Sequence, residues 1–297
     1  MASLLRRLKL FTAGTTPARR FQACEHEYIY GGDNAELFEQ AVALMEKKKF
    51  EQQKLFVHEQ VTEQIKTQFE ALLKVPVKAQ SGPKISLSGF DREEPTHDPA
   101  QKGERDIVRE LLGYSLKVEA SSVPNAGEGV KIQGRLPIGS LVALFPGAVY
   151  LPEHFKKPQY LREVSNNVYA RARFDSIIID AKNETPSPRN PLAVAHKINH
   201  PPAGSSPNVM PFSYDFPPEE PFTDPDYQQF IPNSFVEMPS RISMFGKRAL
   251  VHGLAFITTA DIEDGEELFL NYRYNPDNEL PEWYTSVDAD SDRAMWK

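Results

Sequence analysis

The stretch VAHKINHPPAGSSPNVM, Val194–Met210, contains an unusual arrangement of polar residues. Asn199 and His200 stand at the end of a short apolar run, directly before two prolines. Proline has a fixed φ and no backbone N–H, so these two residues cannot continue a helix or donate to a sheet. The chain must therefore turn sharply here, and Asn208 follows the turn in a Pro-Asn pair.

Two histidines of this stretch, His196 and His200, are four residues apart and would share one face of a helix. A zinc protease helix needs a glutamate after the first histidine, but Lys197 occupies that position. Two histidines without a carboxylate or thiolate make a poor zinc site. The single cysteine, Cys24, excludes an intrachain disulfide and any site built from several thiolates. We therefore expect no metal site.

The sequence on both sides of this stretch indicates a mainly β fold. Short runs of β-branched and aromatic residues, separated by Gly, Pro and Asn, predict strands between Tyr114 and Tyr274. These runs are YSLKVEAS, GVKIQG, SLVALFPGAVYL, NVYARARF, SIIIDA and GLAFITTADI. Residues 186–239 hold 13 of the 25 prolines and no long periodic run, so we expect an insertion of loops with one short helix at Leu192–Ile198. The Asn-His pair suggests that this insertion approaches a site; a plain surface insertion is the alternative.

The N-terminal part is predicted to be helical. Between residues 34 and 74 apolar residues recur at three-and-four spacing, which indicates two amphipathic helices within a helical region at 25–78. The apolar face comprises Leu37, Ala41, Leu44, Met45, Val61, Ile65, Phe69, Leu72 and Leu73. This region either packs on the main domain or forms a partner-binding hairpin. Residues 79–104 have the composition of a linker, and a short helix at 105–112 is expected to end at Gly113.

Two further motifs lie near the ends of the β region. NAGEGV places Gly127 and Gly129 around Glu128; such glycines allow close approach to a ligand, but a hairpin turn needs them equally. It is not a dinucleotide fingerprint, because Ile132 stands where the third glycine would fall. IEDGEELFLNYRY leads from an acidic turn into an apolar run and Tyr272, and a buried tyrosine there usually just satisfies a backbone group.

In this order, the motifs GEG, NH…PN and GEELFLNY resemble those of the SET-domain lysine methyltransferases. The resemblance spans residues 114–274. It implies a mainly β SET fold, with small sheets and a knot-like C-terminal crossing, at 105–274, plus the N-terminal helical region. Within the family, the LFPGAVY strand and the NPLAVAHKINH phrase look most like the group of SET domain-containing protein nine.

The resemblance implies a cofactor, S-adenosyl-L-methionine, whose methyl group is transferred to a lysine of a protein substrate. Backbone groups around Gly127, Glu128 and Gly129 would meet the amino-acid part of the cofactor. Asn199 would bind its ammonium or carboxylate, and the backbone of His200 would address the adenine edge. The lack of chromatin-reading cysteines favours a non-histone substrate.

The resemblance also assigns the reacting end of the site. Tyr272 would touch the cofactor's methyl group and orient the substrate amine. Phe145 and Tyr150 are candidate walls of the substrate channel, with ordinary β-core aromatics as the alternative.

The chain departs from the common family pattern at three places. The Ser-Cys pair that commonly follows the Asn-His pair is missing and the loop is three residues longer. Asn271 replaces the usual Asp. No cysteine follows Tyr272, so the zinc-bound segment that closes the channel in many relatives is absent. The acidic, aromatic tail at 275–297 either covers the site or is disordered; its candidates for a cover are Trp283, Tyr284 and Trp296.

Composition limits the functional classes. With 34 basic and 41 acidic residues the net charge is −7, which argues against general nucleic-acid binding and favours a basic partner. No stretch is long and apolar enough for a membrane span. Residues 1–24 are rich in arginine and have no acid, so they resemble a mitochondrial or plastid transit peptide, or form a disordered basic segment of a cytoplasmic or nuclear protein.

Three hypotheses follow for the function. The first is a protein-lysine methyltransferase. The second is a catalytically inactive SET-fold module that binds cofactor or a protein partner, and the third is a metal-dependent hydrolase, which requires a bound metal.

Overall fold

The computed structural model describes residues 50–75, 106–165, 167–173, 175–182, 190–239 and 249–295. The helices in chain order are α4 (Phe50–Leu73), α5 (Ile107–Leu112), η2 (Pro152–Lys156), α6 (Pro158–Val164), η3 (Ala195–Lys197), α7 (Pro225–Gln228) and α8 (Ala289–Met295). The strands are β1 (Tyr114–Ala120), β2 (Glu128–Gly134), β3 (Leu141–Leu144), β4 (Gly147–Tyr150), β5 (Ala170–Ala172), β6 (Ile178–Asp180), β7 (Val209–Phe216), β8 (Asn233–Phe235) and β9 (Val251–Thr258). The expectations for residues 1–24, for a helix before residue 50, for the linker 79–104 and for Trp296 lie outside the described residues.

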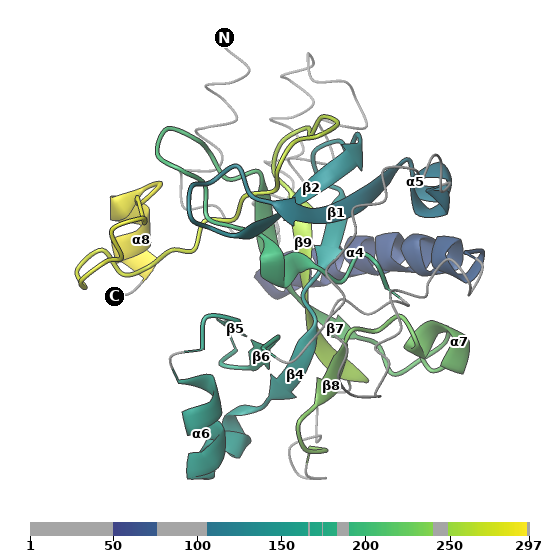
Figure 1. The fold of residues 1–297 in the computed structure, drawn as a ribbon. Coiled ribbons are helices and arrows are strands. Elements are labelled where there is room, and N and C mark those ends of the chain that lie inside the picture. The colour runs from purple at the N-terminus through teal and green to yellow at the C-terminus, as the bar shows by residue number, and fades with distance from the viewer. Residues whose placement is uncertain are drawn as a thin grey trace, which may run out of the picture.

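The described part is a mainly β structure of three small sheets with one long N-terminal helix, as predicted (Figure 1). The strand orders are β1-β2, β3-β9-β7 and β5-β6-β4-β8. Each predicted run contains at least part of a strand, and the longest run splits into β3 and β4. The split falls at Phe145-Pro146, because proline cannot donate to a sheet.

The first sheet is an antiparallel hairpin introduced by α5. Its register runs from Tyr114 opposite Gly134 to Ala120 opposite Glu128. Gly113 ends α5 in the left-handed conformation, with a φ of 81°, and its N–H donates to the carbonyl of Arg109. The predicted glycine cap is therefore confirmed, and it lets the chain pass directly from helix into strand.

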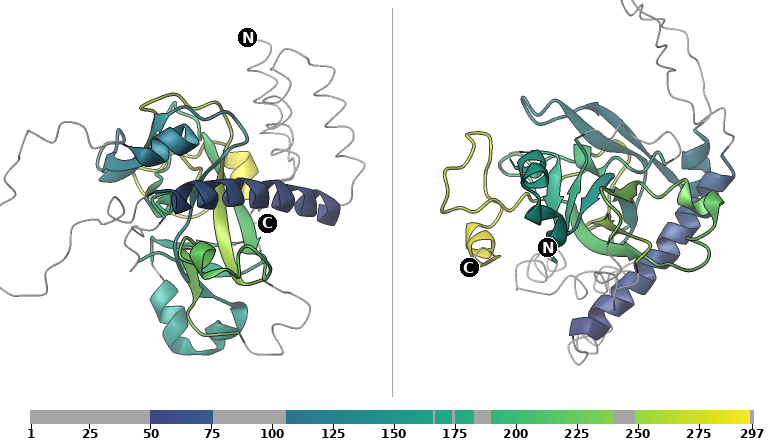
Figure 2. Two further views of the ribbon diagram at one scale, coloured as in Figure 1. Left: turned by 90° about the vertical axis from the view of Figure 1, so that its right-hand side faces the viewer. Right: turned by 90° about the horizontal axis from the view of Figure 1, so that it is seen from below.

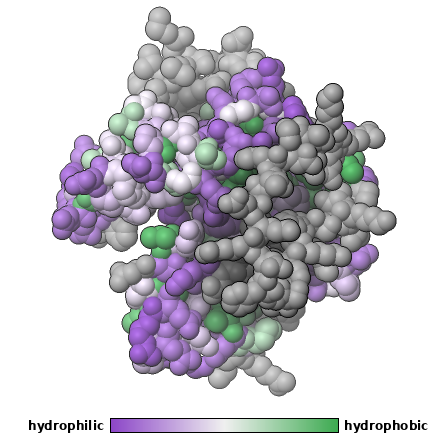
Figure 3. All heavy atoms as spheres, in the orientation of Figure 1, coloured by the Kyte–Doolittle hydropathy of each residue, from purple (hydrophilic) through white to green (hydrophobic). Residues whose placement is uncertain are grey.

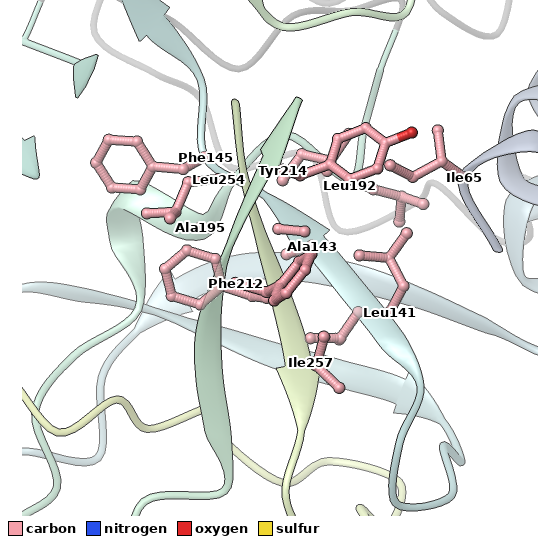
Figure 4. Close-up of a cluster of buried hydrophobic side chains, with 14 of the residues drawn as sticks. Ile65, Leu141, Ala143, Phe145, Leu192, Ala195, Phe212, Tyr214, Leu254 and Ile257 are labelled. Atoms are coloured by element: carbon pink, nitrogen blue, oxygen red, sulfur yellow. The ribbon is translucent and has the colours of Figure 1, made fainter. Parts of the chain in front are cut away.

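The core of the protein lies between α4 and the second sheet. Helix α4 lies across one side of the sheets in Figure 2, and its apolar face enters the core (Figure 4). The buried residues of this face are Val57, Val61, Ile65, Phe69 and Leu72. Leu73, which was predicted to share the face, is 41% exposed. For this helix the interpretation as a layer packed on the main domain is confirmed.

Strand β7 contradicts the expectation that residues 186–239 are an insertion of loops with one short helix. It is eight residues long and pairs antiparallel with β9 over its whole length, from Val209 opposite Thr258 to Phe216 opposite Val251. Pro211 lies within this strand, and β7 is at the edge of its sheet, where a missing N–H is tolerated. The short helix expected at Leu192–Ile198 is a single 3₁₀ turn, η3.

Arg173, which follows β5, joins the third sheet to the second. Its side chain is only 1% exposed, and its guanidinium donates to the carbonyls of Tyr214 and Gly253 at 2.9 and 2.8 Å. It also pairs with the carboxylates of Asp175 and Asp215 at 2.9 and 2.7 Å. Because a buried charge is tolerated only when it is paired, this complete set of acceptors explains how a buried guanidinium is accommodated.

The C-terminal segment 266–270 crosses between two parts of the chain. On one side it bonds to β2, where the N–H of Leu268 donates to the carbonyl of Val130 at 2.8 Å. On the other side it bridges in parallel to the Asn-His stretch, with Asn199 opposite Phe269 and Val209 opposite Leu270. The crossing predicted from the resemblance brings the three motifs into one place.

In the described part of the chain, no helix has the length and apolar character needed to cross a membrane. Within the same residues, no group of three or more His, Cys, Asp or Glu is arranged to hold a metal ion.

Candidate functional site

The two asparagines of the Val194–Met210 stretch hold the crossing together. The side-chain amide of Asn199 donates to the carbonyl of Glu128 on β2 at 2.9 Å. The side chain of Asn208 makes two bonds to the C-terminal segment: it donates to the carbonyl of Glu267 at 2.9 Å and accepts from the N–H of Phe269 at 2.7 Å. An asparagine side chain offers a donor and an acceptor. Asn208 therefore bonds to the backbone of this segment in the same way as the backbone of a neighbouring strand would.

Glu267 is the buried centre of this crossing. Its carboxylate accepts from the hydroxyls of Ser121 and Ser122, both at 2.6 Å, and from the Ser122 N–H at 2.7 Å. The amide of Asn199 lies at 3.4 Å. Burial opposes ionisation of this group, but these hydrogen bonds outweigh burial and lower the pKa of Glu267 below its usual range.

Glu267 also explains Gly129. A Cβ at this position would lie 2.1 Å from Oε1 of Glu267 and 3.2 Å from Nδ2 of Asn199. The carboxylate cannot swing away without losing its serine partners. Position 129 must therefore be glycine, because the side chain of Glu267 occupies the space that a Cβ would need. Gly127 is different: it has a φ of +74° and open space around its Cα, so it serves the hairpin turn and leaves the backbone accessible.

Glu128 lies at the exposed rim of the crossing. Its carboxylate pairs with the ammonium of Lys197 at 2.9 Å, and the two side chains are 57% and 26% exposed. Lys197 also faces the ring of Tyr169 at 6.0 Å. A negative and a positive group therefore stand side by side next to the accessible backbone at Gly127.

His200 connects the crossing to the C-terminal tail. Its Nδ1 accepts from the N–H of Tyr272 at 3.3 Å, so Nε2 carries the hydrogen and donates to the carbonyl of Thr285 at 2.8 Å. The ring of Tyr284 stacks on the imidazole with centroids 4.3 Å apart. Burial lowers the pKa of His200, which favours the neutral ring that this arrangement needs.

The tail thus packs onto the candidate site. Tyr284 is buried, and its hydroxyl accepts from the N–H of Tyr274 at 3.2 Å. Asp292 of α8, which is fully buried, accepts from the Ser286 hydroxyl at 2.7 Å. Trp283 stays 56% exposed and meets the edge of the Tyr272 ring. Of the proposed covering residues in the described tail, Tyr284 covers His200 and Trp283 lies beside Tyr272.

Tyr272 lies at the junction of these elements. Its hydroxyl donates to the carbonyl of Ile198 at 3.0 Å, and the guanidinium of Arg171 lies over its ring, 4.2 Å from the centroid. Burial raises the pKa of the Tyr272 phenol and Arg171 opposes this effect. The phenol therefore stays protonated at neutral pH.

The two proposed channel walls are buried aromatic side chains. Phe145 is 2% exposed and lies near Leu254 and Ala195 in Figure 4, with its ring against those of Phe256 and of His196 in the Asn-His stretch. Tyr150 packs among aromatic side chains of η2 and α6, and its hydroxyl donates to Glu163 at 2.9 Å. The contacts of both residues favour their interpretation as core aromatics.

Sequence reasoning missed Glu267 and Arg171. The signal for Glu267 was its position: it is the second of two glutamates and directly precedes the apolar residues 268–270. A charge beside residues that become buried needs a partner, whereas a charge in an exposed turn does not. The signal for Arg171 was the alternation Ala-Arg-Ala-Arg in a short strand, which predicts two positive charges on one face. Neither signal identifies a partner.

Comparison with known proteins supports the resemblance at the level of sequence. The chain is 25% identical over 238 residues to SET domain-containing protein 9 of Homo sapiens, covering 71% of this chain and 72% of the relative. The protein of the same name from Pongo abelii is also 25% identical, with 71% and 79% covered. The resemblance predicted from the motifs is therefore confirmed. No family model matches the chain.

Solved structures give a weaker likeness. One is ctPRC2 in an autoinhibited conformation bound to S-adenosylmethionine, with a TM-score of 0.31 and 16% identity. Another is Arabidopsis thaliana SUVH6 in complex with SAM, with a TM-score of 0.33 and 18% identity. Each match covers 56% of this chain but only 16% and 28% of the respective solved chains.

Proposed function

We propose that this protein transfers a methyl group from S-adenosyl-L-methionine to a lysine side chain of a protein substrate, which we expect to be a non-histone protein. The sequence similarity to SET domain-containing protein 9 supports the methyltransferase class. The position of Tyr272 is the single observation that carries the proposal. The crossing places it against the Asn-His pair, with its hydroxyl on the carbonyl of Ile198.

The residues of the rim fit the proposed cofactor. Its amino-acid part carries one ammonium and one carboxylate, and Glu128 and Lys197 offer one charge of each sign beside the accessible backbone of Gly127. The amide of Asn199, a neutral polar group, is bonded to the carbonyl of Glu128 beside them. Flat aromatic surface is present on the other side of His200, where Tyr284 and Trp283 lie. When bound, the cofactor supplies an electrophilic methyl group on a positively charged sulfur.

The proposed task of Tyr272 follows from its hydrogen bond. Because the phenol proton is committed to the Ile198 carbonyl, the oxygen offers only lone pairs to any further group. Lone pairs accept an N–H from a lysine amine and hold its nitrogen in one orientation. Methyl transfer is an in-line displacement, so alignment of the nucleophile contributes much of the rate.

The amine must also lose a proton before it reacts. Free lysine has a pKa of about 10.4. Aromatic rings around Tyr272 are provided by His200, Tyr274 and Trp283, and they desolvate a group placed among them. Desolvation disfavours the ammonium and lowers its pKa. Deprotonation is therefore assisted by the surroundings of Tyr272, without a carboxylate acting as a base.

The test compares the unmodified protein with Tyr272→Phe. Calorimetry measures S-adenosyl-L-methionine binding, and a radiolabelled methyl screen on cell extract finds the substrate for a single-turnover assay. We expect cofactor affinity to be nearly unchanged and the methyl-transfer rate to fall at least tenfold. If the variant transfers methyl as fast as the unmodified protein, the role of Tyr272 is wrong.

The second hypothesis, an inactive binding module, gives a different result. Cofactor binding without any labelled extract protein would favour it. Absence of cofactor binding by the folded protein would reject the proposed cofactor. Metal detected in the protein by elemental analysis would favour the hydrolase.

A further inference from the structure

Arg171 places a positive charge on the tyrosine proposed to orient the substrate amine. It is the middle residue of β5, the edge strand of its sheet, and pairs with Ile179. Its guanidinium lies 4.2 Å from the centroid of the Tyr272 ring. A cation at this distance from a ring face is attracted by the ring's negative quadrupole. One face of the Tyr272 ring is thus already occupied by a cation of the protein itself.

Arg171 differs from the other basic groups nearby because no carboxylate in the described ranges lies within ion-pair distance of it. Lys197 is paired with Glu128, and Arg173 with Asp175 and Asp215. The partly buried guanidinium carries five N–H donors, and its interaction with the Tyr272 phenol uses only part of this capacity, so the remaining donors can bind an anion.

The surroundings of Arg171 are open to a large partner. Val168 and Tyr169, directly before β5, are 82% and 38% exposed. Trp283, on the other side of Tyr272, is 56% exposed. Figure 3 shows the surface hollowed between the region of α8 and the region of α6, with hydrophobic side chains on its lower side, and β5 lies in this part of the molecule in Figure 1. Exposed apolar side chains beside a hollow are typical of a surface that receives a peptide.

We propose that Arg171 is a specificity-determining residue that selects a lysine with an acidic residue next to it. This inference rests on the proposed function. A lysine that approaches Tyr272 meets the guanidinium, and two positive charges a few ångströms apart repel each other. A carboxylate beside the lysine removes this repulsion, because it forms a bidentate pair with the guanidinium and draws it off the ring.

Arg171 would therefore have two effects: it would repel the ammonium of a substrate lysine and would bind a carboxylate beside that lysine. Without an acidic neighbour in the substrate, the guanidinium competes with the ammonium for the ring of Tyr272. With such a neighbour, the guanidinium gains the anion that the described part of the chain does not offer it. Selection therefore depends on the residue beside the lysine.

The first experiment measures the competition without any reaction. Butylammonium, which reproduces the end of a lysine side chain, is titrated by NMR into the full-length protein, into Arg171→Ala and into Arg135→Ala. Arg135 is a matched control, because its side chain is 77% exposed and pairs with Glu263 on the surface. We expect Arg171→Ala alone to bind the probe at least tenfold more tightly. Equal binding by all three proteins, or none by any, would overturn the inference.

The second experiment measures selection. Two synthetic peptides that differ only in Asp or Asn beside one lysine are assayed for methyl transfer with the same three proteins. We expect the unmodified protein and Arg135→Ala to prefer the Asp peptide about tenfold in kcat/KM, and Arg171→Ala to lose this preference. A preference that survives in Arg171→Ala, or that is absent from the unmodified protein, contradicts the proposal.

The two failures can be told apart. If calorimetry finds no cofactor binding and no peptide is methylated, the proposed function fails, whatever the butylammonium result. If cofactor binds and peptides are methylated but Arg171→Ala changes neither probe affinity nor peptide preference, only the inference fails.

Discussion

Two arginines that stand two residues apart illustrate the difference between the core and the candidate site. Arg173 is buried, and its guanidinium bonds to two carbonyls and two carboxylates. Arg171 is partly exposed and lies on the ring of Tyr272, without a carboxylate partner in the described ranges. The guanidinium of Arg173 is thus fully paired and joins two sheets, whereas that of Arg171 has no carboxylate partner among the described residues.

The difference separates a region whose charged groups stabilise the fold from a region whose groups can still bind a ligand. Around Arg173, each charge is compensated, so any change there should lower stability. Arg171 and Tyr272 are held in place by their contacts, but some of their hydrogen-bond donors and acceptors remain available to a ligand. Changes there should alter function more than stability, and charges that are uncompensated or perturbed mark functional sites more often than paired ones do.

The largest expected effect is on stability, in Arg173→Ala. Removing this guanidinium leaves the carbonyls of Tyr214 and Gly253 without this donor and leaves Asp215 with only His252 as a charged partner, so we expect a loss of about 3–5 kcal/mol in the free energy of unfolding. Arg171→Ala is the matched control and should lose only about 0.5–1 kcal/mol, the value of an exposed cation–π contact. Urea denaturation measures both. Equal losses would show that the two arginines do not differ as described.

The second effect concerns the cofactor, in Asn199→Ala. The change removes a polar partner from the proposed binding site of a charged ligand, and we expect about 1.5–3 kcal/mol, or roughly 10- to 150-fold, of S-adenosyl-L-methionine affinity to be lost. Calorimetry measures this, and Asn278→Ala, at an exposed position of the tail, is the control. A melting temperature close to that of the unmodified protein shows that the variant is folded. Unchanged affinity would remove Asn199 from the site.

The third effect is a pH dependence of the free energy of unfolding, which we expect from Asp215 beside Arg173. Burial of Asp215 opposes its ionisation, but hydrogen bonding to His252 at 2.7 Å and the charge of Arg173 outweigh burial and hold the pKa of this carboxyl well below its usual range. A pKa that is lower in the folded state contributes stability above the unfolded value, about 3.9, and this stability is lost as the pH falls below it.

Unfolding measured from pH 7 to pH 3 tests this expectation against Asp215→Asn. At pH 7 we expect the variant to be less stable by about 1.5 kcal/mol, the low end for a charged hydrogen bond, because the carboxylate is 37% exposed. Below pH 4 the difference should begin to shrink, because the stability is lost between the unfolded pKa and the much lower folded pKa of Asp215. Parallel curves over the whole range would mean that Asp215 is not the responsible group.

The smallest expected effect is the stability of Tyr272→Phe. The hydroxyl makes one hydrogen bond, to the carbonyl of Ile198, so its loss should cost about 1 kcal/mol. Thermal unfolding without cofactor measures it. A loss of several kcal/mol would place Tyr272 with Arg173 among the groups that hold the fold together, and would weaken the division between the two regions.

Much of the fold could be predicted because its signals are local. Strand periodicity predicted the mainly β region, and Gly113 predicted the end of α5. The spacing of Val61, Ile65 and Phe69 predicted the buried face of α4. Strand β7 was missed because Pro211 reads locally as a loop residue, whereas its tolerance depends on an edge position that only the pairing with β9 creates.

The candidate site divides in the same way. The sequence alone determined that the three motifs occur in the order of the SET-domain family, because motif order is a property of the chain. Only the tertiary structure decided that Gly129 makes room for Glu267, that Asn208 binds the segment at Phe269, and that Arg171 faces Tyr272. These partners are from 61 to 138 residues apart along the chain, by subtraction of their numbers. A hydrogen bond or a steric contact depends on distances of a few ångströms in space, and no local pattern encodes which distant residue comes that close.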